Sequence, residues 1–151
     1  MEDALIQLVS AWVGTVGFAL VFNVEKKCVI AASLGGLLIW GVFLLCDSLL
    51  SLGVFSSTVI AAASGQIYSE IMARIYKSPT TVFFIPGVVP LIPGGSLYRT
   101  MYAAVFQNWE QCRYYGIQTL LGTLGIAVGL SFVSGVLYIL ANRAKQKATK
   151  R

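Results

Sequence analysis

Five long apolar windows without a charged residue follow one another along the chain, separated by short connections that carry charged or polar residues. Each window is long enough for a helix to cross a hydrocarbon core, which takes roughly 20 residues. None shows the alternation of a strand. The windows run from Ala4 to Phe22, Cys28 to Cys46, Ser48 to Ser69, Ser78 to Tyr98 and Tyr114 to Asn142. The pattern predicts an all-α integral membrane protein with about five transmembrane helices.

Composition supports this prediction and removes the soluble alternatives. Hydrophobic residues make up 57% of the 151 residues and charged ones only 11%, which excludes the charged surface of a soluble domain. Glu2 and Asp3 precede the first window, whose end lacks a small-residue cleavage site, so it reads as a retained span rather than a signal peptide. We expect one helical transmembrane domain over residues 1–142 and a basic cytoplasmic tail over residues 143–151.

Basic residues alternate along the connections, and this alternation predicts an orientation. Lys26 and Lys27 follow the first window, and Arg74 and Lys77 follow the third. The tail adds five more basic residues: Arg143, Lys145, Lys147, Lys150 and Arg151. Because basic connections stay in the cytoplasm, we expect an N-terminus outside and a C-terminus in the cytoplasm. The net charge of +5 then points to an anionic lipid bilayer as partner and not to a nucleic acid.

The fourth window is interrupted by prolines and glycines, in the stretch FFIPGVVPLIPGGSLYRT. Each proline lacks an N–H and clashes with the preceding turn of a helix. The residues of the expected helix break are Pro86, Gly87, Pro90 and Pro93, followed by Gly94 and Gly95. Backbone groups freed in hydrocarbon cost several kcal/mol each, so the break must be buried in protein or face an aqueous cavity.

The residues after the break predict an anion site. Ser96 is placed to cap a second half-helix, whose partly positive N-terminus would point into the membrane, with Arg99 in its first turn. Exposed N–H groups and a guanidinium together suit a carboxylate. An alternative stays open, in which Arg99 reaches the outer interface to bind a lipid phosphate and the prolines form only a packing kink.

Small and polar residues inside the spans give weaker signals. Ser57, Ala61 and Gly65, and also Gly125 and Gly129, recur at helical spacing and predict close helix packing, within this chain or against another. Most polar residues near the ends of the windows are expected at solvated interfaces: Asn23, Glu25, Gln66, Glu70 and Gln118. Glu70 and Arg74 are one helical turn apart and are expected to pair.

Enzyme signatures are missing from the sequence. It has no GxxxxGK[ST], GxSxG or HExxH motif and no histidine, and its three cysteines have no CxxC spacing. We therefore expect no enzyme activity, no cofactor and no metal site. Uphill movement of a solute would then draw on an ion gradient or on a partner.

Two stretches resemble a known family. The segment SPTTVFFIPGVVPLIPGGSLYRTMYAAV resembles the proline-rich block of the threonine/serine exporter family, in its short C-terminal-type module as in YjjB-like proteins. GFALVFNVEKK resembles the GFA-x-x-FNV segment of that module. The matching motif residues are Asn23, Pro86, Pro90, Pro93, Gly94, Tyr98 and Met101. Arg99 is outside the family pattern, which makes it a specificity determinant in this interpretation.

The resemblance implies an exporter subunit for small carboxylate-bearing solutes, either a dicarboxylate such as succinate or amino acids such as threonine and serine. It also implies a larger membrane subunit of the N-terminal type as partner, in a bacterial inner membrane. Substrate-binding candidates are Asn23, Gly94, Gly95, Ser96, Tyr98 and Arg99. Two other functions stay open, a non-transporting scaffold that stabilises the larger subunit and a channel. Whether the short subunit also forms homo-oligomers stays open too.

Overall fold

The computed structural model describes the backbone of residues 2–149 and the side chains of residues 4–48 and 50–139. All regular elements in this part of the chain are helical, which confirms the all-α class. The helices are α1 (Glu2–Val21), α2 (Lys26–Leu44), α3 (Val54–Tyr76), α4 (Thr81–Val88), α5 (Gly94–Val105) and α6 (Trp109–Thr149). A π-helical turn, η1 (Leu45–Leu49), ends α2, and a 3₁₀ turn, η2 (Val89–Leu91), ends α4.

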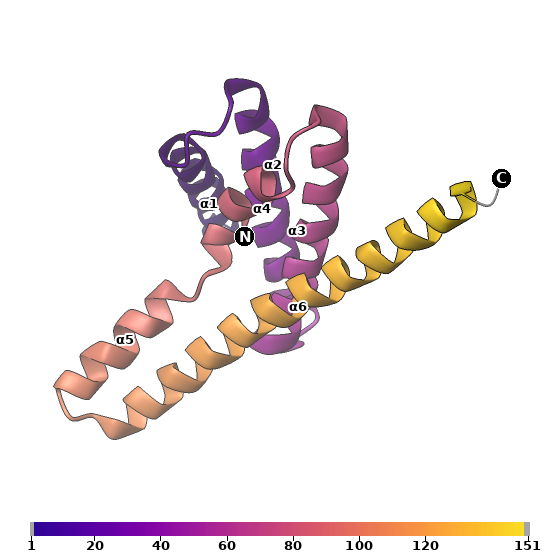
Figure 1. The fold of residues 1–151 in the computed structure, drawn as a ribbon. Coiled ribbons are helices and arrows are strands. Elements are labelled where there is room, and N and C mark those ends of the chain that lie inside the picture. Colours follow the sequence, from indigo (N-terminus) through magenta and orange to yellow (C-terminus); the bar gives the residue numbers. More distant parts are fainter. Residues whose placement is uncertain (1, 150–151) are drawn as a thin grey trace.

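The helices form two regions that share α6 (Figure 1). Helices α1 to α4 lie together as a bundle, with α2 between α1 and α3. Helix α5 runs away from this bundle and returns as α6, which packs first on α5 and then across α3. We call α5 and the part of α6 beside it the hairpin.

Three helices are long and apolar enough to cross a membrane: Ala4–Val21, Lys26–Ser48 and Trp109–Ile139. A fourth span results if the bent pair Thr81–Leu91 and Gly94–Val105 counts as one. Helix α3 has 23 residues, but its serines together with Glu70 and Arg74 lower its hydropathy. The chain is thus a multi-pass membrane protein, and its fifth crossing stays a prediction.

The small-residue faces pack within this chain. A Cβ atom added to Gly125 would lie 2.8 Å from the Cβ of Thr58, and one added to Gly129 would lie 2.6 Å from the Val59 carbonyl oxygen, so α6 lies directly on α3. Gly65 brings α3 equally close to Ile39 of α2. Ser57 and Ala61, on the same helix, are fully buried. Close backbone approach of this kind is what associates helices in lipid.

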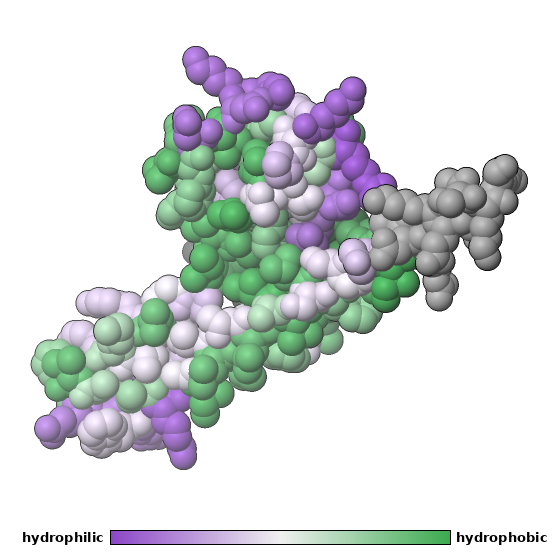
Figure 2. Space-filling view, viewed as in Figure 1, coloured by the Kyte–Doolittle hydropathy of each residue, from purple (hydrophilic) through white to green (hydrophobic). Residues whose placement is uncertain are grey.

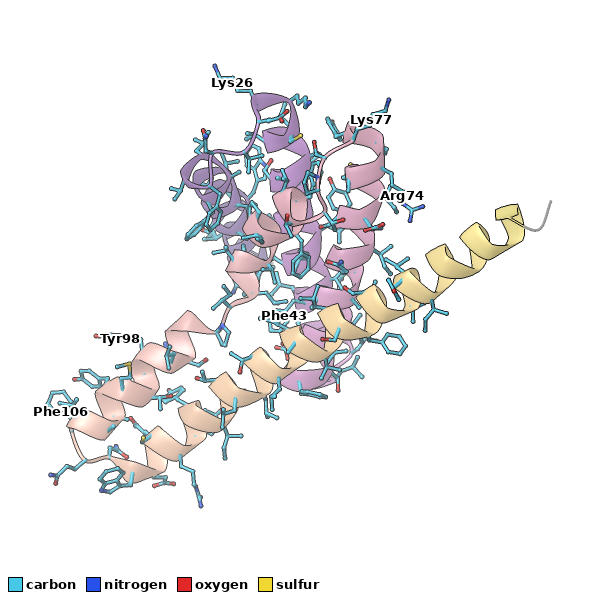
Figure 3. The ribbon with its side chains drawn as sticks, in the orientation of Figure 1. Lys26, Phe43, Arg74, Lys77, Tyr98 and Phe106 are labelled. Carbon is cyan, nitrogen blue, oxygen red and sulfur yellow. The ribbon has the colours of Figure 1, made fainter. Side chains whose placement is uncertain are left out.

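Hydrophilic residues gather at two ends of the molecule, and hydrophobic ones cover most of the surface between (Figure 2). One end is that of the bundle where α1 joins α2 and α3 joins α4, from which Lys26, Arg74 and Lys77 project (Figure 3). The other is the tip of the hairpin. The expected pair between Glu70 and Arg74 is present, at 3.2 Å. The side chains of the predicted basic tail lie outside the described residues.

Gln66 differs from its expected place at a solvated interface. Its side chain is only 8% exposed and faces α6, where its Nε2 donates to the Ser134 hydroxyl at 3.3 Å. The Oε1 atom is buried without a hydrogen-bond partner among the described residues. Gln66 is therefore a contact between α3 and α6 and not an interface residue.

Candidate functional site

The interruption of the fourth window is shorter than the sequence predicts. Pro86 and Gly87, expected in the break, lie buried inside α4. A proline in a helix removes one backbone hydrogen bond, and a short buried helix tolerates this loss. Pro90 lies in the 3₁₀ turn η2, and the chain is extended only at Ile92, before Pro93. The residue before a proline avoids the helical region, which explains why the helix stops there. The axes on the two sides of this point differ by 44°.

Helix α5 starts at Gly94, three residues earlier than the sequence suggests. Pro93 is its N-cap, and its carbonyl accepts the first intrahelical hydrogen bond, from the Leu97 N–H at 3.0 Å. Ser96 is therefore not the cap but the third helical residue, and no side chain caps this helix. Arg99 falls in the second turn and not in the first. The proline takes the cap position because its fixed φ leads directly into a helix.

A cavity of about 510 Å³ opens at the start of α5, and we call it the break cavity. It lies where the hairpin leaves the bundle, and residues of both regions line it. Its walls include Trp40 and Phe43 of α2, Thr58 of α3, Pro90 and Pro93 of the break, Gly95 and Ser96 of α5, and Tyr115 and Gln118 of α6. The volume suits a small organic solute.

Arg99 does not line the break cavity itself but contacts Tyr115, which does. Its Nη1 donates to the Tyr115 hydroxyl at 3.4 Å, and its guanidinium carbon lies 5.4 Å from the centre of the Tyr115 ring. This is a cation–π contact between α5 and α6. Arg99 itself is exposed, whereas Tyr115 lines the cavity. The arginine thus holds a cavity residue in place and contributes positive charge beside it.

Of the other predicted binding residues, some line the break cavity and some lie outside it. Gly95 and Ser96 line the break cavity, while Gly94 and Tyr98 are not among its lining residues. Tyr98 is 69% exposed and projects from α5 on the side away from α6 (Figure 3). Met101, a residue of the family motif, is also exposed. The outer face of α5 therefore carries motif residues that do not touch the cavity.

Asn23 lies in the connection between α1 and α2. It adopts a left-handed backbone with φ of 52°, which asparagine tolerates better than most residues. Its N–H donates to the Leu20 carbonyl and the Val24 N–H donates to the Ala19 carbonyl, both at 3.0 Å. These two bonds are the usual way in which a left-handed residue ends a helix. Asn23 lines a separate cavity of about 450 Å³.

Two residues of the break cavity were missed by sequence reasoning. Trp40 has a buried indole Nε1 without a hydrogen-bond partner among the described residues, and nothing distinguishes it in sequence from any apolar tryptophan of a span. Tyr115 lies one residue into the last window. The signal that could have found it is its distance from Arg99, since a helix hairpin with a short turn places residues 16 positions apart side by side.

The described residues contain no group of three or more histidine, cysteine, aspartate or glutamate side chains that could hold a metal ion. The walls of the break cavity are mainly apolar and carry a few neutral hydrogen-bonding groups. Tyr115 brings a hydroxyl and Gln118 an amide, while the indole Nε1 of Trp40 is buried. These groups can donate hydrogen bonds to an acceptor such as a carboxylate.

Comparison with known proteins supports the resemblance noted in the sequence. The family described as threonine/serine exporter, ThrE, matches residues 7–136, which include both cavities. A threonine/serine exporter of Corynebacterium glutamicum is 29% identical over 135 residues, which are 89% of this chain and 25% of that protein. The chain thus spans about a quarter of the length of this relative. No solved structure matches. Since the family match extends from α1 into α6, the chain belongs to the threonine/serine exporter family.

Proposed function

We propose that this protein is a subunit of a two-component exporter of small carboxylate-bearing solutes, which bind in the break cavity. The candidate solutes are amino acids such as threonine and serine, or a dicarboxylate such as succinate. Membership of an exporter family supports transport rather than catalysis. The observation that carries the proposal is the cavity of about 510 Å³ at the start of α5, where apolar walls surround a few hydrogen-bond donors.

The start of α5 supplies the chemistry for a carboxylate. The first N–H groups of a helix have no partner within the helix, and no side chain caps α5. The Gly94 N–H donates to the Ile92 carbonyl at 2.7 Å, which leaves the N–H groups of Gly95 and Ser96 as the donors for a carboxylate. Gly95 and Ser96 bring this end to the cavity wall, where the helix dipole favours a negative charge. The Tyr115 hydroxyl and the Gln118 amide face the same space from α6. The apolar rings of Trp40 and Phe43 lower the local dielectric and strengthen these interactions.

Charge supports an orientation for this subunit. The end of the bundle that carries Lys26, Arg74 and Lys77 faces the cytoplasm of a bacterial inner membrane in our proposal, with the N-terminus outside. Helices α4 and α5 then form one broken span that leads outward, and α6 returns. Irregular backbone at membrane depth is tolerated where it lines a cavity, as it does here.

A larger partner completes the exporter in this proposal. The matched region is only a quarter of the C. glutamicum exporter, and the rest of that protein has no counterpart in this chain. The exposed apolar face of α5 offers a surface for such a partner, and it carries Tyr98, Met101, Val105 and Phe106. The same face is what favours the second candidate function, a scaffold that stabilises the larger subunit without touching the solute.

The test is efflux of L-threonine and of succinate from cells that express this chain with its partner, at matched membrane levels. Arg99→Ala and Arg99→Lys should each lower efflux about tenfold or more, because neither side chain can both stack on Tyr115 and donate a planar pair of N–H groups. Arg113→Ala, which changes another exposed arginine at the hairpin, should leave efflux unchanged.

Cavity variants complete this test. Gln118→Leu and Tyr115→Phe remove an amide and a hydroxyl from the break cavity while keeping most of the side-chain volume. Normal efflux in both Arg99 variants and in both cavity variants would contradict the proposed site. A scaffold predicts another result, in which deletion of this chain lowers the membrane level of the partner and restoring that level restores efflux.

A further inference from the structure

A second cavity, of about 450 Å³, lies at the opposite end of α4 from the break, and we call it the loop cavity. It is formed where the connection between α1 and α2 meets the connection between α3 and α4, two segments some 50 residues apart in sequence. Its lining includes Asn23, Glu25, Ser78, Thr81, Ile85 and Pro86. Both connections were singled out in the sequence, yet neither contributes to the break cavity.

The walls of the loop cavity are held by specific contacts. Asn23 and Lys77 both adopt left-handed backbone conformations, with φ of 52° and 53°, and they end α1 and α3 beside the cavity. The Ser78 N–H donates to the Ala73 carbonyl at 3.1 Å, and the Ser78 hydroxyl lies 3.7 Å from the buried Cys28 thiol of α2. The Ser78 contact thus joins the connection between α3 and α4 to the first turn of α2.

Charges around the loop cavity favour an anion. Its one lining carboxylate, that of Glu25, pairs with Lys27 at 2.8 Å. Lys26 and Lys77 are exposed at the same end and have no ion-pair partner among the described residues (Figure 3). Neutral hydrogen-bond donors are available among the lining residues, in the Asn23 amide and the Thr81 hydroxyl, while the Ser78 hydroxyl donates to the Tyr76 carbonyl at 3.3 Å.

The two cavities lie along one helical path. Pro86 lines the loop cavity and Pro90 lines the break cavity. Residues four apart share one face of a helix and are separated by about 6 Å of rise. The lining residues of the two cavities thus come within about one helical turn of each other along the segment formed by α4 and η2.

We propose that the loop cavity is a second binding site for a carboxylate-bearing solute, on the lysine-bearing side of the membrane, from which the solute passes along α4 to the break cavity. This inference rests on the proposed function and adds to it a site at which the solute binds first. Asn23 and Thr81 hold the carboxylate, while Lys26 and Lys77 raise its local concentration.

The first test is transport into everted vesicles, in which the lysine-bearing end faces the medium, with the partner present. Asn23→Gly keeps the left-handed backbone and removes the amide, and Thr81→Val removes only a hydroxyl. Each should raise the half-saturating concentration of L-threonine or succinate roughly tenfold, the cost of one hydrogen bond to a charged group, and leave the maximal rate unchanged. Thr123→Val, whose hydroxyl bonds only carbonyls of its own helix, is the matched control.

The outcomes separate this inference from the proposed function. Unchanged half-saturation in both loop-cavity variants, with a lower maximal rate in Arg99→Ala, would overturn the loop site and leave the break site standing. Raised half-saturation in the loop-cavity variants with a normal Arg99→Ala would support the loop site and contradict the break site.

A second test needs no transport. Thr81→Cys in a Cys112→Ser background places one reactive thiol in the loop cavity, since Cys28 and Cys46 are buried. In detergent-solubilised protein, millimolar L-threonine or succinate should slow its reaction with a maleimide several-fold, and Glu110→Cys, at an exposed position of the hairpin tip, should show no protection. Protection by threonine alone would support the site with Glu25 as partner of the ammonium group. A labelling rate that neither solute changes would overturn the inference.

Discussion

The bundle and the hairpin of this protein are packed in different ways. Where α6 crosses α3, glycines let the two backbones pack in direct contact. A Cβ atom added at Gly129 would lie 2.6 Å from a carbonyl oxygen of α3. Along the hairpin only Ala103 of α5 is buried, and the outer face carries large exposed side chains. Close backbone contact holds the helices of the bundle together in lipid, whereas α5 of the hairpin is attached mainly through α6 and the break. The break cavity lies where these two kinds of packing meet.

The largest effect is expected from Gly129→Ala, because a methyl group there meets backbone atoms that cannot rotate away. Overpacking of this kind costs about 1–3 kcal/mol, and the shift of a whole helix places it at the upper end. Gly135→Ala on the same helix meets nothing within 4 Å and should stabilise the chain through its helix propensity, by up to about 1 kcal/mol. Thermal unfolding in detergent measures both changes. Equal midpoints for the two variants would contradict the difference in packing.

A smaller effect is expected in the hairpin from Ala103→Leu. The residue is 3% exposed on the face that packs on α6, so the larger side chain must push the two helices apart. Because α5 has few other neighbours, it can move, and we expect a cost of about 1 kcal/mol. Val105→Leu, at an exposed position of the same helix, is the control and should cost nothing measurable. A loss as large as that of Gly129→Ala would show that the hairpin is held as rigidly as the bundle.

The smallest effect concerns the hydrogen bond between Gln66 and Ser134, which joins α3 to α6. Hydrogen bonds between membrane helices average about 0.6 kcal/mol in double-mutant cycles. We expect a coupling energy of this size from Gln66→Leu, Ser134→Ala and the double variant, measured by their unfolding midpoints. Additive single effects would mean that packing alone holds α6 on α3.

The sequence predicts the long helices of the fold well, but it predicts the limits of the helix break poorly. Apolar windows and basic connections place α1, α2 and α6, since hydropathy is a property of each segment alone. The sequence predicts a longer break than the structure has, because a proline such as Pro86 is tolerated in a helix when neighbouring helices bury the turn around it. Burial of this kind depends on α2 and α3, and no local pattern reports it.

The same limit applies to the candidate site. Gly95, Ser96 and Arg99 were found from the motif around the break, but their partners Trp40 and Tyr115 come from other helices. Asn23 was grouped with them because the resemblance marks it, yet it lies in the loop cavity. Which residues share a cavity follows from the way helices cross, and that information is not in the spacing along the chain.

The length of α6 has a consequence for the lipid. Its apolar part, Trp109–Ile139, has 31 residues and therefore measures about 46 Å, against a hydrocarbon core of about 30 Å. A helix so long fits by tilting, in keeping with its oblique course across α3 (Figure 1). Tilt is set by packing against neighbouring helices, and here the glycines that lay α6 on α3 set it. Since α5 packs on the first part of α6, the same glycines fix the direction in which the hairpin leaves the bundle.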